Sequence, residues 1–178
     1  MHDHHLSLSH PESGLTFSSP VPSLGPVRWL SSREVRPTLK AVYQSWQQSS
    51  GTGTLESFAS IQHELWVAQH GACPEPDICL VPSKRDKQVL GVMSGFRRYG
   101  HKDFFVQSMA IHPLYAANET ASHRITQRLL EAAMDESISM GCYGWVSCAP
   151  EPNEVEFWRD LGFSRHDAFT FKRMGYFH

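Results

Sequence analysis

The middle of the chain constrains the fold more than any other part of the sequence. Three β-like runs, residues 78–81, 89–96 and 104–111, follow one another with short charged or glycine-containing links. Because short links join neighbouring strands, we expect these runs to pair antiparallel. A long amphipathic helix ending at Gly141 and a strand at 143–148 come next. A strand, a helix and a strand in this order predict a right-handed parallel crossover.

Helices and short strands are expected on either side of this β region. A short strand at 27–30 leads into an amphipathic helix that starts close to Pro37, since proline fits only the first turn of a helix. A second helix follows the glycine-containing break at 51–53. Near the end of the chain a short helix stops at Gly162, and residues 163–174 supply one or two closing strands.

The length of 178 residues predicts one domain. Residues 1–26 contain four histidines among their first ten residues, with serines, glycines and prolines but without periodicity. We therefore expect a flexible N-terminal tail at 1–26 and one domain at 27–178. A mobile histidine-rich segment offers no fixed ligand geometry, so no metal site is expected, and the role of the histidines stays open.

Charge and motif content exclude several classes of function. Sixteen Lys and Arg against eighteen Asp and Glu give a net charge of -2, so no global field favours nucleic acid or an anionic membrane surface. No apolar run approaches the roughly 20 residues of a membrane span, and no signal-peptide pattern is present, so a cytoplasmic location is expected. The four cysteines form no C-x-x-C pair and are expected to be reduced and mostly buried. No motif supports a hydrolase, a P-loop protein, a metalloprotease or a dinucleotide-binding protein.

Three markers in the second half of the chain resemble those of the GNAT superfamily of acyltransferases, in the same order. Residues 109–113 read Met-Ala-Ile-His-Pro, like the phrase that ends the superfamily's fourth strand, and the long helix stops at Gly141. Residues 157–163 read Phe-Trp-Arg-Asp-Leu-Gly-Phe, like the superfamily's aromatic pair and Leu-Gly-Phe. The resemblance implies an α/β (α+β) fold with a mixed, mostly antiparallel central sheet of about six to seven strands, flanked by about four helices.

The resemblance also implies a function and a set of contacts. The function is an acyl-CoA-dependent N-acyltransferase that uses acetyl-CoA and transfers the acyl group directly to a primary amine on a small molecule or a protein; a homodimer is left open. A splayed strand can bond an extended amide chain, and a helix N-terminus suits a pyrophosphate. By resemblance, pantetheine is lined by Met109, Ala110 and Ile111. The pyrophosphate is held by the loop and first turn of a helix beginning near Ser122, at His123, Arg124, Ile125 and Thr126.

Two departures from the superfamily pattern motivate an alternative. The pyrophosphate loop of the superfamily reads R/Q-x-x-G-x-G/A, and the aligned residues here are Ala121, Arg124 and Thr126, none of which matches. Arg124 either bonds a phosphate, fills the space that the phosphate needs, or is an exposed helix residue. Residues 116–120 look like an insertion before the helix. The alternative function is therefore a catalytically silent GNAT-like domain that acts as a binding or regulatory module.

No catalytic residue is identified. Trp158 stands where many superfamily members have a tyrosine, and because indole cannot protonate a thiolate, we expect Trp158 in the core or in a pocket wall. Superfamily members that use a carboxylate or histidine base on the fourth strand carry it at a position that corresponds to Phe105 or Gln107. Neither of these side chains takes up a proton at neutral pH. The nearby titratable candidates, each equally explained as a turn or surface residue, are Asp103, His101, His112 and Glu64.

Overall fold

The computed structural model describes residues 21–49, 55–71, 73–166 and 171–173. In chain order its elements are β1 (Arg28–Trp29), α1 (Ser32–Ser49), α2 (Glu56–Gln69), β2 (Asp77–Pro82), β3 (Val89–Arg98), a 3-10 turn (Tyr99–His101), β4 (Asp103–Ile111), α3 (Pro113–Ala116), α4 (Glu119–Ser139), β5 (Val146–Cys148), α5 (Val155–Asp160), β6 (Arg165–His166) and β7 (Phe171–Arg173). Within the described residues, seven strands form one sheet in the order β1-β2-β3-β4-β5-β7-β6. The pairs are antiparallel except for β4 and β5, so the expected fold class is confirmed.

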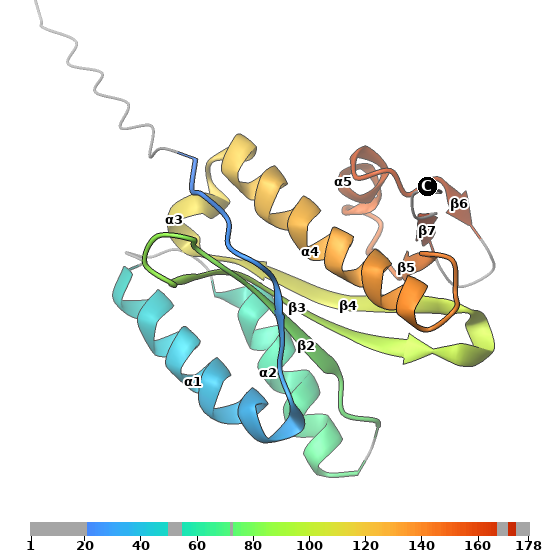
Figure 1. Cartoon of the computed structure of the whole chain (residues 1–178), viewed down its shortest axis with the longest axis horizontal. Coiled ribbons are helices and arrows are strands. Elements are labelled where there is room, and N and C mark those ends of the chain that lie inside the picture. Colours follow the sequence, from blue (N-terminus) through green and yellow to red (C-terminus); the bar gives the residue numbers. More distant parts are fainter. Residues whose placement is uncertain (1–20, 50–54, 72, 167–170, 174–178) are drawn as a thin grey trace, which may run out of the picture.

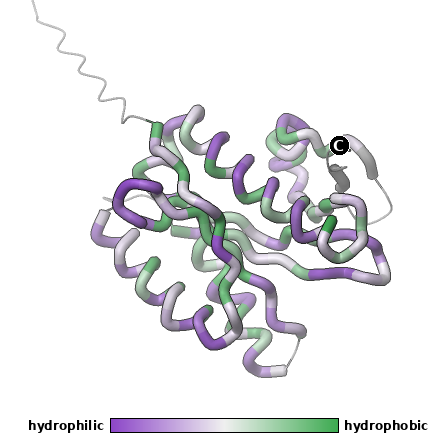
Figure 2. The backbone as a smooth tube through the Cα atoms, in the orientation of Figure 1, coloured by the Kyte–Doolittle hydropathy of each residue, from purple (hydrophilic) through white to green (hydrophobic). Residues whose placement is uncertain are grey.

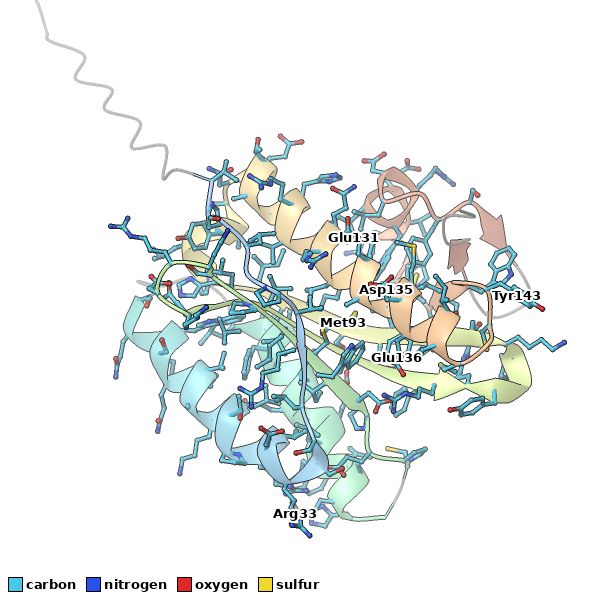
Figure 3. The ribbon with its side chains drawn as sticks, in the orientation of Figure 1. Arg33, Met93, Glu131, Asp135, Glu136 and Tyr143 are labelled. Atoms are coloured by element: carbon cyan, nitrogen blue, oxygen red, sulfur yellow. The ribbon has the colours of Figure 1, made fainter. Side chains whose placement is uncertain are left out.

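Helices cover both faces of this sheet, with α1 and α2 on one face and α4 and α5 on the other (Figure 1). Alternate residues of β2 explain the two layers, because Ile78 and Leu80 pack under α1 and α2, whereas Cys79 and Val81 pack under α4. Apolar segments accordingly follow the strands through the middle of the molecule (Figure 2), and Met93 lies at the centre of the sheet (Figure 3). None of the helices in the described part of the chain has the length and apolarity that crossing a membrane requires.

Helix α1 begins a few residues before Pro37, close to the expected start. Ser31 and Glu34 form one half of a capping box: the Glu34 carboxylate reaches back and accepts hydrogen bonds from the Ser31 N–H at 3.0 Å and the Ser31 hydroxyl at 2.7 Å. The Ser31 carbonyl in turn accepts from the N–H groups of Glu34 and Val35. This cap starts the helix at Ser32, and Pro37 lies inside it.

The expected tail at 1–26 lies mostly outside the described residues, and its boundary stays a prediction. Residues 1–20 are not described, whereas Leu24 forms an isolated β-bridge with Ser83. The Gly25 N–H also donates to the Pro82 carbonyl at 2.7 Å. The described part of the segment therefore runs along the end of β2.

Helix α4 begins at Glu119 rather than near Ser122. Asn118 is its N-cap, and the Asn118 side chain accepts a hydrogen bond from the Ala121 N–H at 2.9 Å. The residues that looked like an insertion, 116–120, are divided between the end of α3, this cap and the first turn of α4. The stretch between β4 and α4 is therefore largely helical.

A β-bulge interrupts β4 at Gln107. The consecutive β3 residues Ser94 and Gly95 pair with Ser108 and Val106, so Gln107 has no partner of its own on β3. An extra residue in one strand reverses the alternation of its side chains between the two faces of the sheet. The bulge therefore divides β4 into two segments that present their side chains in opposite phase.

The packing on either side of the bulge shows this reversal. Phe104 and Val106 belong to the apolar cluster under α4, whereas Ala110, an even number of residues further on, belongs to the cluster under α1 and α2. Gly95 allows β3 to lie close to the bulge, since a Cβ at this position would lie 2.6 Å from the Phe105 carbonyl oxygen and 2.4 Å from the Phe104 ring. Only glycine fits here without displacing β4.

Candidate functional site

Strands β4 and β5 pair at their start and then separate. The parallel register joins residues 104–106 to residues 146–148, so residues 107–111 of β4 continue without a partner on the β5 side. Pairing with β3 continues to Ile111 on the opposite edge. Among the described residues, one edge of β4 therefore stays open over residues 107–111, and pairing with β3 holds residues 108–111 from the other edge.

The register identifies the backbone groups that face this opening. The His112 N–H donates to the Leu90 carbonyl on the β3 side at 2.8 Å. Because hydrogen-bonding direction alternates along an antiparallel strand, the N–H and C=O groups of Met109 and Ile111 point away from β3, toward the open edge. This edge can accept an extended amide chain by strand addition.

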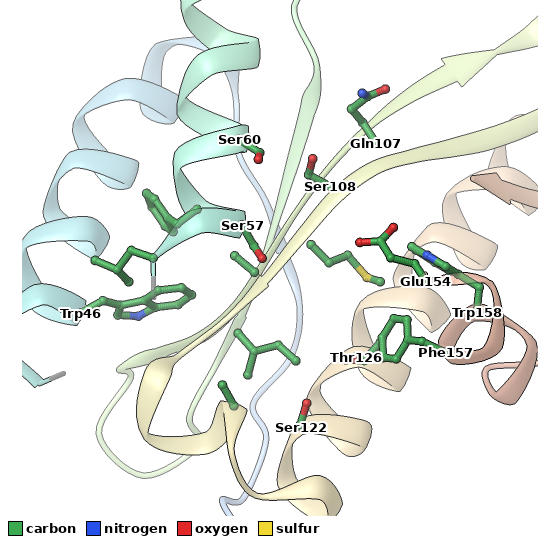
Figure 4. A pocket seen from close by; sticks show the side chains of 16 residues that line it. Trp46, Ser57, Ser60, Gln107, Ser108, Ser122, Thr126, Glu154, Phe157 and Trp158 are labelled. Atoms are coloured by element: carbon green, nitrogen blue, oxygen red, sulfur yellow. The ribbon is translucent and has the colours of Figure 1, made fainter. Parts of the chain in front are cut away.

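A cavity of about 380 Å³ lies at the open edge (Figure 4). Its walls come from β4, from α1 and α2 on one side, and from α3, α4 and α5 on the other. The lining residues are Trp46, Leu55, Ser57, Phe58, Ser60, Gln107, Ser108, Met109, Ala110, Ile111, Ala116, Ser122, Thr126, Glu154, Phe157 and Trp158.

The residues predicted to line pantetheine all reach this cavity: Met109, Ala110 and Ile111. Of the residues predicted to hold the pyrophosphate, Thr126 reaches it, whereas His123 and Arg124 are exposed on α4. Ile125 is fully buried, and its side chain lies where a Cβ on Gly91 of β3 would stand. Because α4 begins at Glu119, the N–H groups of residues 123–126 lie inside the helix and bond to the preceding turn. An anion beside these residues must therefore be held by side chains.

Sequence reasoning missed several lining residues, chiefly Ser122, Glu154 and Phe157. Glu154 is the residue before α5, and its carboxylate extends toward β4 (Figure 4). The sequence indicated the start of this helix through Pro150 and Pro152. It carried no signal that the helix start faces the end of β4, since that contact depends on the crossover.

Trp158 is a core and pocket-wall residue, as expected. Its side chain is 7% exposed, and its ring packs edge-on against Phe163 with centroids 5.0 Å apart. The same ring lines the cavity. At the predicted base positions, Gln107 lines the cavity, and Phe105 lies under the Arg98 guanidinium, whose carbon is 4.4 Å from the ring centroid.

Two of the candidate bases have structural partners. Asp103 is fully buried and accepts two hydrogen bonds from Arg98, at 2.9 and 2.8 Å, and one from the Ser147 hydroxyl at 2.9 Å. His112 is also fully buried, and its Nδ1 accepts from the Leu114 N–H at 3.2 Å. Burial lowers the pKa of His112 below the usual range of histidine. Asp103 therefore joins strands, and His112 caps α3.

The other two candidates differ in their surroundings. His101 is exposed in the turn before β4. Glu64 on α2 is half-buried, and its carboxylate accepts one hydrogen bond each from the hydroxyls of Ser94 and Ser108, both at 2.6 Å. Ser108 lines the cavity, so Glu64 is one hydroxyl group away from it.

The cysteines are free thiols, and three of them are buried, as expected: Cys79, Cys142 and Cys148. Cys73 is exposed. Burial raises the pKa of Cys79 to about 12 and also raises the pKa of Cys148, at the end of β5. These two thiols are therefore protonated at neutral pH, and no cysteine is among the described residues that line the cavity.

Solved structures share this fold at low sequence identity. Tetrahymena GCN5 matches at 7% identity with a TM-score of 0.52, covering 84% of this chain and 96% of that one. The PaiA N-acetyltransferase from Thermoplasma acidophilum, in complex with coenzyme A, matches at 15% identity and 0.50, covering 86% and 99%. AtaTR bound with AcCoA matches at 14% and 0.51, covering 85% and 93%.

Sequence comparison gives the family. A search of curated proteins finds no match. The sequence model of the acetyltransferase (GNAT) family, in contrast, matches residues 39–163, which is more than half of the chain. The matched range includes β4 with its open edge and the helices α4 and α5. The protein therefore belongs to the GNAT acetyltransferase family.

Proposed function

We propose that the protein transfers an acetyl group from acetyl-CoA directly to a primary amine. The observation that carries this proposal is the open edge of β4, where Met109 and Ile111 turn unpaired backbone groups toward a cavity. A pantetheine chain carries two amides at a spacing that suits such an edge, and strand addition gives it affinity without special side chains. The family membership and the coenzyme A complexes of two proteins with this fold agree with this use.

The same geometry supports a proposal for the cofactor contacts. We assign the pantetheine arm to Met109, Ala110 and Ile111, and the pyrophosphate to the first two turns of α4. There the Thr126 side chain lines the cavity, while His123 and Arg124 are exposed on the same helix. Ile125 packs against β3 and fixes the position of α4 relative to the open edge.

The proposed reaction needs alignment more than a dedicated nucleophile on the protein. The amine nitrogen attacks the thioester carbonyl carbon, and a C–N bond forms. The C–S bond then breaks with its electron pair on sulfur, and the leaving thiolate takes up a proton as the nitrogen loses one. A backbone N–H on the open edge donates to the oxyanion that develops. Direct transfer is favoured because the nearby thiol of Cys148 is buried and protonated.

A specific observation favours the silent binding module as the second candidate. The Asn118 cap already bonds the Ala121 N–H, and α4 absorbs the residues that a glycine-rich loop would leave free. Calorimetric titration with acetyl-CoA separates the two functions. The enzyme requires saturable binding, and absence of both heat and a thermal shift at millimolar acetyl-CoA would leave the silent module as the function.

A matched pair of variants tests the phosphate assignment. Arg124→Ala should weaken acetyl-CoA binding by about three- to tenfold, the loss of one charge-assisted bond. Arg128→Ala, one turn further along α4, removes a cation paired with Glu131 and should leave the affinity unchanged. Equal affinities for the two variants would remove Arg124 from the cofactor site.

A further inference from the structure

A groove adjoins the cofactor cavity on the α2 side of Gln107. We call it the α2 groove, and it is lined by Glu56, Ala59, Ser60, His63, Glu64, Gln107 and Ser108. Ser60, Gln107 and Ser108 also line the cofactor cavity, and Figure 4 shows Ser60 on α2 facing the middle of β4, where Gln107 and Ser108 lie. The groove and the cavity therefore meet at the β-bulge, beside the point where β4 and β5 separate.

Glu64 is fixed at this junction. Its two carboxylate oxygens each accept a hydroxyl hydrogen bond, from Ser94 on β3 and from Ser108 on β4, both at 2.6 Å. The bulge at Gln107 brings this about, because it turns the Ser108 side chain to the α2 face. Among the described residues, no lysine, arginine or histidine lies within ion-pair distance of Glu64. The site therefore holds an oriented carboxylate without a counter-ion.

The surroundings of Glu64 have an excess of negative charge. The neighbouring depression, which shares Glu64, His63 and Gln107 with the groove, brings in further charged or titratable groups: Cys73, Glu75, Asp77, Arg97, Arg98 and Tyr99. Both arginines are already held by carboxylates, Arg97 by Asp77 and Glu136 at 2.6 Å each, and Arg98 by Asp103.

Three carboxylates remain without an ion-pair partner among the described residues: Glu56, Glu64 and Glu75. His63 also lines the groove, and it is exposed. A ligand with positive charge at both ends suits this distribution.

We infer that the α2 groove binds the acceptor, that the acceptor is an aliphatic diamine, and that Glu64 binds the reacting ammonium and takes up its proton. The inference rests on the proposed acetyl transfer. One proton moves from the ammonium nitrogen to the Glu64 carboxylate, and the freed lone pair attacks the thioester carbon. The second proton of the nitrogen goes to the departing thiolate, and Glu64 returns its proton to solvent. The proposed base, Glu64, thus lies on α2, whereas the position on β4 where a base was expected from the resemblance is Gln107.

Binding of two probes to the protein without acetyl-CoA tests the acceptor class. Putrescine and γ-aminobutyrate share a chain length and an amino group but carry an ammonium or a carboxylate at the far end. Calorimetry should show putrescine binding at least about tenfold more tightly than γ-aminobutyrate, the effect of one charge-assisted contact. Equal affinities, or tighter binding of γ-aminobutyrate, would overturn the assignment.

A charge-neutral variant tests the role of Glu64. Glu64→Gln retains the size of the side chain, and its amide can both accept from and donate to the two serines, so folding should be preserved. Putrescine affinity should fall by about tenfold or more. Glu131→Gln, on the outer part of α4, makes the same chemical change and should leave the affinity unchanged. An unchanged affinity in Glu64→Gln would overturn the inference.

The failure of the inference and the failure of the proposed function can be told apart. Acetyl-CoA affinity should be the same in the parent and in Glu64→Gln, while the pH–rate profile for putrescine acetylation should shift to higher pH in the variant because more neutral amine is then required. If putrescine binding depends on Glu64 but the protein does not bind acetyl-CoA, the amine site is retained and the acetyl-transfer step is overturned. Acetyl-CoA binding with no Glu64-dependent putrescine binding would overturn the inference alone.

Discussion

The two segments of β4 on either side of Gln107 belong to one strand but differ in almost every physical respect. Residues 104–106 have strand partners on both edges, and Asp103 before them belongs to the buried network with Arg98 and Ser147. Residues 108–111 have a strand partner on one edge only, the bulge residue Gln107 has none among the described residues, and all five line a cavity. A single extra residue separates a segment that holds the sheet together from a segment that offers backbone groups to a ligand.

A rigid segment that is paired on both edges and an open segment that can bind a ligand are thus adjacent within one strand. The ligand-facing segment needs no hydrogen bonds on its open edge because β3 fixes its opposite edge. The doubly paired segment supplies the anchor. Changes in the doubly paired segment should therefore reduce stability, and changes in the ligand-facing segment should reduce ligand binding.

Asp103→Ala should have the largest effect and should act on stability. It leaves the Arg98 guanidinium and the Ser147 hydroxyl without their shared acceptor. Breaking a buried ion pair in this way costs about 3 to 5 kcal/mol of unfolding free energy, which urea denaturation would measure. A loss below about 1 kcal/mol would show that the network is not the anchor of β4.

Met109→Trp should have an intermediate effect and should act on binding. The larger side chain fills the open cavity, so acetyl-CoA affinity should fall by about tenfold or more, while overpacking of this half-buried position against the buried cluster costs about 1 to 2 kcal/mol. Met109→Leu conserves volume and should bind nearly as the parent does. Calorimetric titration of both variants gives the comparison, and full binding by the tryptophan variant would mean that pantetheine does not lie beside Met109.

His112→Gln should have the smallest effect, at the end of the open segment. Burial lowers the folded-state pKa of His112, so the unfolded chain takes up a proton at higher pH than the folded chain does. The stability that this histidine contributes is full above its unfolded pKa of about 6.5 and is lost as the pH falls through the lowered folded pKa. Melting temperatures of parent and variant test this at about pH 7.5 and about pH 5, which lie above and below the unfolded pKa of about 6.5. Parallel pH dependence in the two proteins would contradict it.

The strands could be predicted from the sequence, because apolar runs bounded by charged and glycine-containing turns define them locally. The bulge could not. Residues 103–111 are apolar at most positions on both sides of Gln107, so the pattern does not show where the alternation changes phase. The capping residue Asn118 was visible in the sequence, but alignment with a loop motif drew attention to Ser122 instead.

The candidate site could be predicted only in part, because a local motif identifies consecutive residues but not contacts between separate segments. Met109, Ala110 and Ile111 are consecutive on one strand, so a local motif identified them. The arrangement of Glu64 depends on a helix, on β3 and on the phase of β4 after the bulge. No local pattern encodes a contact among three separate segments of the chain.

The outer edge of β2 is covered by other parts of the chain, whereas the edge of β4 is open. Residues 28–29 pair with it, the Leu30 N–H donates to Ile78, and Leu24 and Gly25 cover its end beside Ser83 and Pro82. An uncovered outer strand with the apolar sequence of β2 would be a template for association with another molecule through backbone hydrogen bonds. The segment before α1 therefore covers β2, and the outer edge at this end of the described sheet is a strand of two residues, which offers another molecule far less backbone than the six residues of β2 would.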